Sequence, residues 1–216
     1  MAHIEEKTGR LIFKEISYPS VIQANYLADM QDEHRIDDII NIYTKLMPWN
    51  RGTPPCSHTE IGFWVDGELW FFSSTSRNEL GCGTLKKNGT RWIKASDLLH
   101  NPDRWLLQEK VYIRELPGYD INEKIIRAND IIGLTYDFYG VGADFLNPFR
   151  TLFGRDLTPE LIAKLKKIYC SKAVHLVDTG RLMVMSPKHR FKVAEKLGYV
   201  KFPDTEMFLS LRNVNK

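Results

Sequence analysis

The stretch that decides the fold is residues 57–75, SHTEIGFWVDGELWFFSST. Two apolar, aromatic-rich runs flank Asp66-Gly67, and this dipeptide is typical of a two-residue hairpin turn because both of its residues must adopt positive φ. Such a turn fixes the register, so Val65 faces Glu68, and side chains then alternate between the two faces of each strand. The register gathers four polar side chains on one face near the open end of the hairpin: His58, Glu60, Ser73 and Thr75.

Outward from the hairpin, the chain mixes extended and helical patterns. Extended patterns are expected at residues 91–94, 110–116, 182–185, 199–202 and 207–211, and helical ones at 36–47, 96–99, 122–134, from 158 onward, at 171–178 and at 188–197. This mixture predicts an α+β domain in which an antiparallel sheet packs against helices. Helical patterning within residues 20–47 predicts that residues 1–50 form a helical extension on a single globular unit of residues 51–216.

The composition is typical of a globular protein. Of the 216 residues, 43% are hydrophobic and 26% are charged, which excludes a disordered tail, a collagen-like fibre and a coiled coil. Three cysteines are too few for a disulfide scaffold and predict reduced thiols in a cytoplasmic protein. No apolar run approaches the ~20 residues of a membrane span, and the first residues lack a signal-peptide pattern.

The net charge of +3 is unevenly distributed along the chain. Residues 161–216 contain 12 Lys/Arg and 4 Asp/Glu, a balance of +8, which leaves −5 for residues 1–160. A basic C-terminal quarter could bind an acidic partner or nucleic acid. Because the charges alternate with apolar residues at helical spacing, we expect solvated helix faces instead, with His189 and Arg190 facing solvent.

Cys170 stands at the start of a short expected helix that Gly180 closes. The positive end of a helix stabilises a thiolate, and its unpaired N–H groups can bind an oxyanion. A nucleophilic cysteine also needs a histidine base and a third polar group that orients the histidine. His58 is the candidate base, and Glu60 or Ser73 is the candidate for the third polar group. Taken alone, however, a cysteine at a helix start is more often a small buried apolar residue, and a lone histidine on a strand is more often structural.

Other candidate residues carry weaker signals. Cys56, His58 and Cys170 lack the paired spacing of a zinc site, so neither a metal nor an organic cofactor is expected. Cys82 lies between two glycines that favour a turn. His175 is five residues after Cys170, off the nucleophile's face, which favours a surface or core-edge position.

Several short motifs, in this order, resemble one known family. They are SHTEI at 57–61, the strand ending in Ser73-Ser74, GLTYDF at 133–138, YCSKAV at 169–174 and MSP at 185–187. Together they resemble the circularly permuted papain-like hydrolases of the NlpC superfamily, in the YiiX-like branch. The similarity extends over roughly residues 57–200. Two positions depart from the family pattern: Lys172 replaces a frequent Glu, and Ser73 stands where Glu, His, Asn or Gln is usual.

The resemblance implies a papain-like fold in permuted order, with Cys170 as nucleophile and His58 as base. It also implies that Tyr136 and Tyr169 line the substrate site, although Tyr136 could simply be a packed tyrosine with a satisfied hydroxyl. Relatives act on peptidoglycan peptides, lipids or protein amides. The substrate expected from the resemblance is therefore a peptide, an amide or a lipid ester, and the sequence carries no clear nucleic-acid or membrane signal.

These observations predict a cysteine-dependent hydrolase or acyltransferase, acting on an amide or ester carbonyl. A second hypothesis belongs to another class of protein. It is a catalytically silent papain-like binding module that uses the basic C-terminal surface to engage an acidic partner, since a fold does not fix a function.

Overall fold

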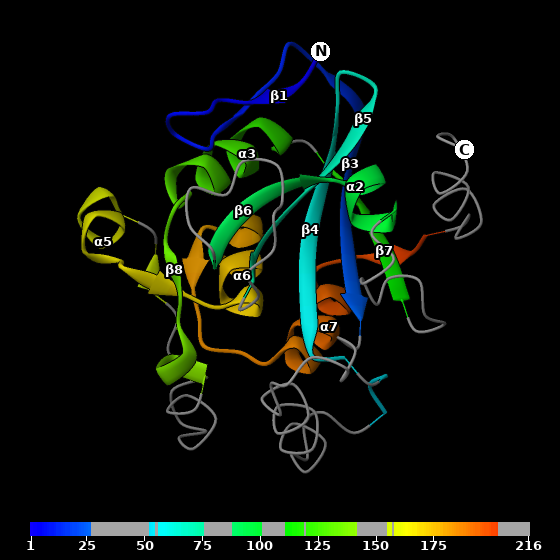
Figure 1. The fold of residues 1–216 in the computed structure, drawn as a ribbon. Helices are drawn as coiled ribbons and strands as arrows, with labels where there is room; N and C mark the ends of the chain where they lie inside the picture. The colour runs from blue at the N-terminus through cyan, green and yellow to red at the C-terminus, as the bar shows by residue number, and fades with distance from the viewer. Residues whose placement is uncertain are drawn as a thin grey trace.

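We describe a computed structural model of the chain, which is drawn in Figure 1. The described residues are 1–26, 52–54, 56–75, 88–100, 111–118, 120–141, 155–156 and 158–202. Their largest element is a six-stranded sheet in the order β12-β7-β3-β4-β5-β6, and every neighbouring pair in it is antiparallel. The strands are β12 (Val200–Lys201), β7 (Val111–Pro117), β3 (Ile16–Tyr26), β4 (His58–Val65), β5 (Glu68–Thr75) and β6 (Gly89–Lys94).

The hairpin of β4 and β5 has the predicted turn and register. Val65 pairs with Glu68, and the pairing continues to Ile61 opposite Phe72. Asp66 and Gly67 have φ of 48° and 79°, the left-handed conformation that this turn requires. The carboxylate of Asp66 also accepts hydrogen bonds from the backbone N–H groups of residues 14 and 15, which ties the turn to the segment before β3.

The predicted helical extension is wrong for residues 1–26. They form β1 (His3–Ile4), β2 (Leu11–Ile12) and β3, and β3 pairs with β4 on one side and β7 on the other. Both faces of β3 are buried at residues 21–25, so a central strand there needs no apolar alternation. The pairing of β3 with two distant strands therefore outweighs the weak helical pattern in its sequence. The strongest helical pattern, residues 36–47, lies outside the described residues.

Three helices pack near one another beside the sheet: α3 (Ile121–Asp130), α6 (Cys170–Thr179) and α7 (Pro187–Lys196). Helix α6 is central, since it contacts β4, β5, α3 and α7 (Figure 1). Its Ala173, Val174 and Val177 belong to the main core cluster together with Ile61 and Phe63 of β4. The coarse prediction of an α+β domain, with an antiparallel sheet packed against helices, is confirmed.

The described residues also include helices α2 (Ala95–His100) and α5 (Pro159–Lys164), and strands β8 to β11 form two small pairs. In these pairs β8 (Thr135–Tyr136) lies parallel to β10 (Lys167–Ile168), and β9 (Arg155–Asp156) antiparallel to β11 (Arg181–Leu182). Helix α3 ends at Asp130, earlier than predicted, and the strand expected at 182–185 is only Arg181–Leu182. The strand expected at 207–211 lies outside the described residues. No helix among the described residues is long and apolar enough to span a membrane.

The charges of α7 do not all face solvent, contrary to the prediction. Arg190 is completely buried and Lys188 is 3% exposed, while His189 is partly buried. Helix α7 packs against both β4 and α6, so charged side chains on two of its faces are buried. Helical spacing shows which residues share a face, but it does not show how many neighbours surround the helix.

Candidate active site

Cys170 is the first residue of α6, as predicted, and three contacts fix its position. The preceding strand β10 pairs with β8, and the hydroxyl of Ser74 on β5 donates a hydrogen bond of 2.7 Å to the carbonyl of Ile168. The next residue, Ser171, donates to the carbonyl of Met185. Cys170 itself is 3% exposed. The helix ends at Gly180, whose φ of 72° places it in the left-handed region.

His58 is the first residue of β4, and its side chain is 13% exposed. Its Nε2 atom lies 3.0 Å from the hydroxyl of Ser73 and 3.4 Å from a carboxylate oxygen of Glu60. The imidazole is also hydrogen-bonded to the side chain of Cys170. The structure therefore brings together all four residues predicted as catalytic. Glu60 and Ser73, left as alternatives for the third polar group, both contact the ring.

The contacts of Ser73 indicate how the imidazole is oriented. The Ser73 hydroxyl donates to the carbonyl of Thr59 at 3.0 Å, so its lone pairs remain to accept a hydrogen bond from Nε2–H. In a neutral ring held in this way the proton is on Nε2 and the lone pair is on Nδ1.

Arg91 on β6 is a member of this network that sequence reasoning missed. Its guanidinium lies 3.2 Å from the same Glu60 oxygen that faces His58, and both side chains are buried. Arg91 pairs with Ser73 in the β5–β6 register. The sequence predicted a strand at 91–94 but gave no turn signal that would set its register against β5. The sequence shows Arg91 only as the first residue of a short predicted strand, which does not indicate a buried partner.

The charges around His58 favour its protonated form. Burial disfavours a charged imidazole, but the charge and hydrogen bond of Cys170, together with those of Glu60, outweigh it and raise the pKa of His58 to about 10. At neutral pH the ring is therefore an imidazolium. A positive ring next to a cysteine sulfur is the arrangement that a nucleophilic cysteine requires.

Cys56, two residues before His58, differs from Cys170. It is completely buried, and burial raises the pKa of its thiol to about 12, even though the charge of Lys188 opposes this rise. Cys56 is thus an uncharged neighbour of the site at neutral pH. Cys82, predicted to lie in a turn, falls outside the described residues. No group of three or more potential metal ligands occurs among the described His, Cys, Asp and Glu residues.

The two tyrosines predicted to line the substrate site lie on the segments next to Cys170. Tyr169 precedes Cys170 as the N-cap residue of α6, and Tyr136 pairs with Ile168 across β8 and β10. Both are buried and share a small apolar cluster with Val141. Thr75, the fourth polar residue predicted on the hairpin face, is buried and pairs with Gly89 of β6.

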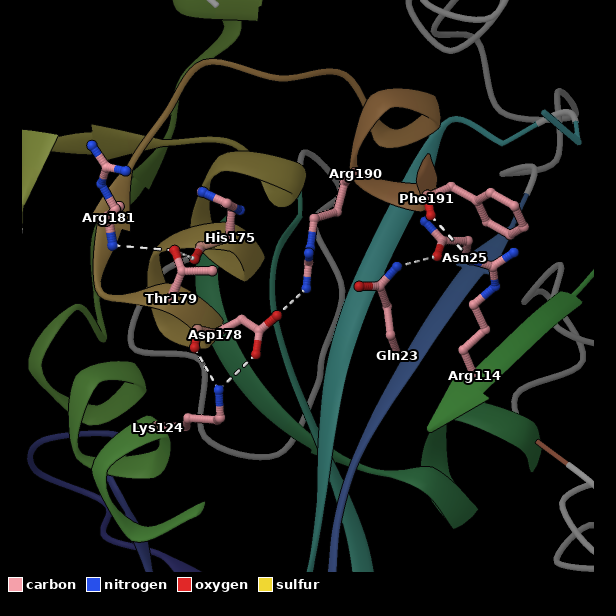
Figure 2. Close-up of polar contacts among 10 residues, drawn as sticks. All are labelled: Gln23, Asn25, Arg114, Lys124, His175, Asp178, Thr179, Arg181, Arg190 and Phe191. Carbon is pink, nitrogen blue, oxygen red and sulfur yellow. Dashed lines mark hydrogen bonds and ion pairs between the residues drawn. The ribbon is translucent and has the colours of Figure 1, made fainter. Parts of the chain in front are cut away.

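The far end of α6 holds a second buried polar cluster, which Figure 2 shows. The carboxylate of Asp178 accepts hydrogen bonds from Arg190 of α7 and from Lys124 of α3, the latter at 2.7 Å. His175, predicted at the surface or core edge, is only 4% exposed because α6 is enclosed by other elements. Burial, reinforced by the charge of Arg190, lowers the pKa of His175 to about 3.

Comparison with known proteins gave no match among family models, curated proteins or solved structures.

Proposed function

We propose that this protein is a cysteine-dependent hydrolase or acyltransferase in which Cys170 is the nucleophile and His58 the general base. The observation that carries the proposal is one arrangement: a thiol at a helix N-terminus, hydrogen-bonded to an imidazole whose Nε2 also contacts Ser73 and Glu60. Nucleophile, base and orienting group are the three parts that covalent acyl transfer requires.

The chemistry follows from the positions of these groups. The thiolate of Cys170 attacks a carbonyl carbon, and a C–S bond forms. The backbone N–H of Cys170, at the start of α6, is suited to stabilise the oxyanion. The imidazolium of His58 gives its proton to the leaving amine or alcohol as the C–N or C–O bond breaks. The neutral imidazole then takes a proton from water or another acceptor, which attacks the thioester and releases the acyl group.

The order of the elements supports a papain-like fold in permuted order, the finer architecture we infer. A histidine strand comes first, a strand with a polar residue follows, and the cysteine helix comes last. The substrate class that we infer from the resemblance is an acyl donor of the peptide, amide or lipid-ester type. Tyr136 and Tyr169 are proposed to line its acyl group, because their cluster lies directly beside Cys170.

Thiol labelling tests the proposal. The full-length protein is treated with iodoacetamide at pH 6, and each cysteine is quantified by peptide mass spectrometry. Cys170 should react at least about tenfold faster than a free thiol, while Cys56 should remain largely unlabelled. The variant His58→Gln should slow the labelling of Cys170 by at least about tenfold.

Turnover is tested with small activated esters and amides of several acyl classes. The variant Cys170→Ser should lower hydrolysis by about three orders of magnitude or more, and Cys56→Ser provides the matched control. If Cys170 reacts as slowly as Cys56 and Cys170→Ser changes no activity, the proposal is wrong. Such a result would favour the silent binding module instead.

A further inference from the structure

We propose that Arg91 is a positioning residue of the active site, which acts through Glu60 to limit how strongly that carboxylate stabilises the positive charge of the His58 ring. This inference rests on the proposed function, because it names what regulates the base of the same site. It concerns a buried arginine to which the catalytic steps assign no role. A ring whose positive charge is stabilised less strongly gives its proton more readily to a leaving group.

The proposal starts from one carboxylate oxygen with two partners. Oε1 of Glu60 lies 3.4 Å from Nε2 of His58 and 3.2 Å from a guanidinium nitrogen of Arg91. A carboxylate oxygen has lone pairs for two donors, but each donor reduces the negative charge available to the other. The guanidinium therefore weakens the attraction between the carboxylate and the imidazolium.

The register of the sheet fixes this arrangement. Arg91 pairs with Ser73 across β5 and β6, and the Ser73 hydroxyl lies 3.0 Å from the same Nε2 of His58. His58 and Glu60 are two residues apart on β4, so their side chains extend from the same face of the strand. Three neighbouring strands thus hold the guanidinium, the carboxylate and the imidazole in one row of contacts.

Burial makes the influence of Arg91 large. The side chains of Arg91 and Glu60 are almost completely buried, and charges a few ångströms apart interact strongly in such an environment. The other titratable and charged side chains near the ring include Cys170 of α6, Cys56 just before β4, and Lys188 of α7, whose charge acts on Cys56. Cys170 has the strongest of the effects that raise the pKa of His58, so the influence of Arg91 is best measured without that thiol.

NMR of ring-labelled histidine in the full-length variant Cys170→Ala tests the proposal. Adding Arg91→Met should raise the titration midpoint of His58 by about one unit or more, because the cation beside the shared oxygen is lost. Adding Glu60→Gln instead should lower the midpoint by roughly one unit. If Arg91 served only to hold Glu60 in place, its loss would lower the midpoint as Glu60→Gln does. A midpoint that falls or stays constant in Arg91→Met therefore overturns the proposal.

Two further variants serve as controls in the same Cys170→Ala chain. Arg91→Lys keeps a positive charge on the strand and should change the His58 midpoint less than Arg91→Met does. The matched control is Lys94→Met, since Lys94 lies three residues further along β6 and its Nζ is 2.9 Å from a carboxylate oxygen of Glu68. Removal of that ion pair should leave the His58 midpoint unchanged.

Turnover gives a second readout, in the chain that retains Cys170. The probes are the p-nitrophenyl and ethyl esters of one acyl group, because p-nitrophenolate departs without a proton whereas the ethyl alcohol must receive one. Arg91→Met makes the imidazolium a weaker acid, so it should lower kcat/KM for the ethyl ester at least about threefold more than for the p-nitrophenyl ester. Equal losses with the two esters would contradict a role of Arg91 in proton transfer.

The proposal stays falsifiable where Arg91→Met does not fold. In Cys170→Ala, NMR of labelled arginine should show the guanidinium resonances of Arg91, identified by their absence from Arg91→Lys, shifting as His58 titrates. Resonances that ignore the titration of His58 would overturn the proposal. The proposed function fails separately, when Cys170 reacts no faster than a free thiol and neither ester is hydrolysed. The titrations are made without that thiol and still decide whether Arg91 acts on His58.

Discussion

Two histidines lie along α6: His58 of β4 next to its first residue, and His175 within the helix. Their neighbours give the two rings opposite charge states. Burial disfavours the charged form of both His58 and His175. At the N-terminal end, Cys170 and Glu60 overcome burial and raise the pKa of His58 to about 10. At the C-terminal end, Arg190 adds to burial, and the pKa of His175 falls to about 3. Neighbouring charges, not burial, therefore decide which histidine can act on a proton.

The two clusters also use their carboxylates differently. Asp178 has two cationic partners, and although burial works against ionisation, Arg190 and Lys124 hold the pKa of Asp178 below its usual range. That carboxylate joins three helices. Glu60 faces His58 and Arg91 at once. One end of α6 thus fixes the packing of helices, while the other sets the charge and contacts of His58.

The largest expected effect concerns the C-terminal cluster. The variant Asp178→Asn leaves the buried cations of Arg190 and Lys124 without their carboxylate, and we expect it to lower the free energy of unfolding by about 3–5 kcal/mol. Urea titration followed by circular dichroism measures this. The control is Glu195→Gln, which removes the 56%-exposed partner of Arg114 and should cost less than about 1 kcal/mol. Equal losses in the two variants would contradict a structural role for the Asp178 cluster.

The next effect concerns the charge states of the two histidines. NMR of ring-labelled histidine should show His58 protonated from pH 6.5 up to about 10, and His175 neutral down to about pH 3. In Cys170→Ala the midpoint of His58 should fall, because Cys170 is the strongest of the influences that raise its pKa. Ordinary titration of both rings near pH 6.5 would show that the two environments do not differ as described.

The titration of His175 also predicts a change of stability with pH. Its folded-state pKa is depressed, so the unfolded chain binds more protons between pH 3 and 6.5. The stabilisation is fully present above pH 6.5 and is lost as the pH falls towards about 3. The variant His175→Leu should therefore have a shallower acid limb in a plot of unfolding free energy against pH.

The smallest effect separates Glu60 from Ser73 within the N-terminal cluster. The variant Glu60→Gln keeps the shape of the side chain but removes the charge that stabilises the imidazolium. We expect it to lower the midpoint of the His58 titration by roughly one unit, which the same NMR of ring-labelled histidine measures. Ser73→Ala removes an uncharged contact and should lower that midpoint by less than about half a unit. The reverse order would make Ser73 the principal orienting group.

Much of the candidate site could be predicted because it depends on local signals. The Asp66-Gly67 turn fixed the hairpin, and the hairpin alone placed His58, Glu60 and Ser73 on one face. The start of the helix at Cys170 and its end at Gly180 were also predicted from neighbouring residues. The sequence left open whether Glu60 could reach His58 from two residues along the strand. The structure gives a separation of 3.4 Å between Nε2 and the carboxylate oxygen.

What could not be predicted depends on partners distant in the sequence. The position of β3 between β4 and β7 requires pairing across long connections, and no turn signal specifies it. The same holds for Arg91. Its position opposite Ser73 depends on the pairing of β6 with β5, whose register could not be predicted from the sequence. Because sheet pairing is cooperative and non-local, a weak helical pattern in one segment carries little weight against it.

The sequence by itself determined which residues can do chemistry and which local elements hold them, since turns, caps and strand alternation depend on near neighbours. The tertiary structure alone decided how these residues are charged. It brought Cys170 against His58, paired Glu60 with Arg91, and buried Arg190, which was expected to face solvent. Electrostatic energies depend on distance and dehydration in three dimensions, so the proton positions of this site follow from its packing.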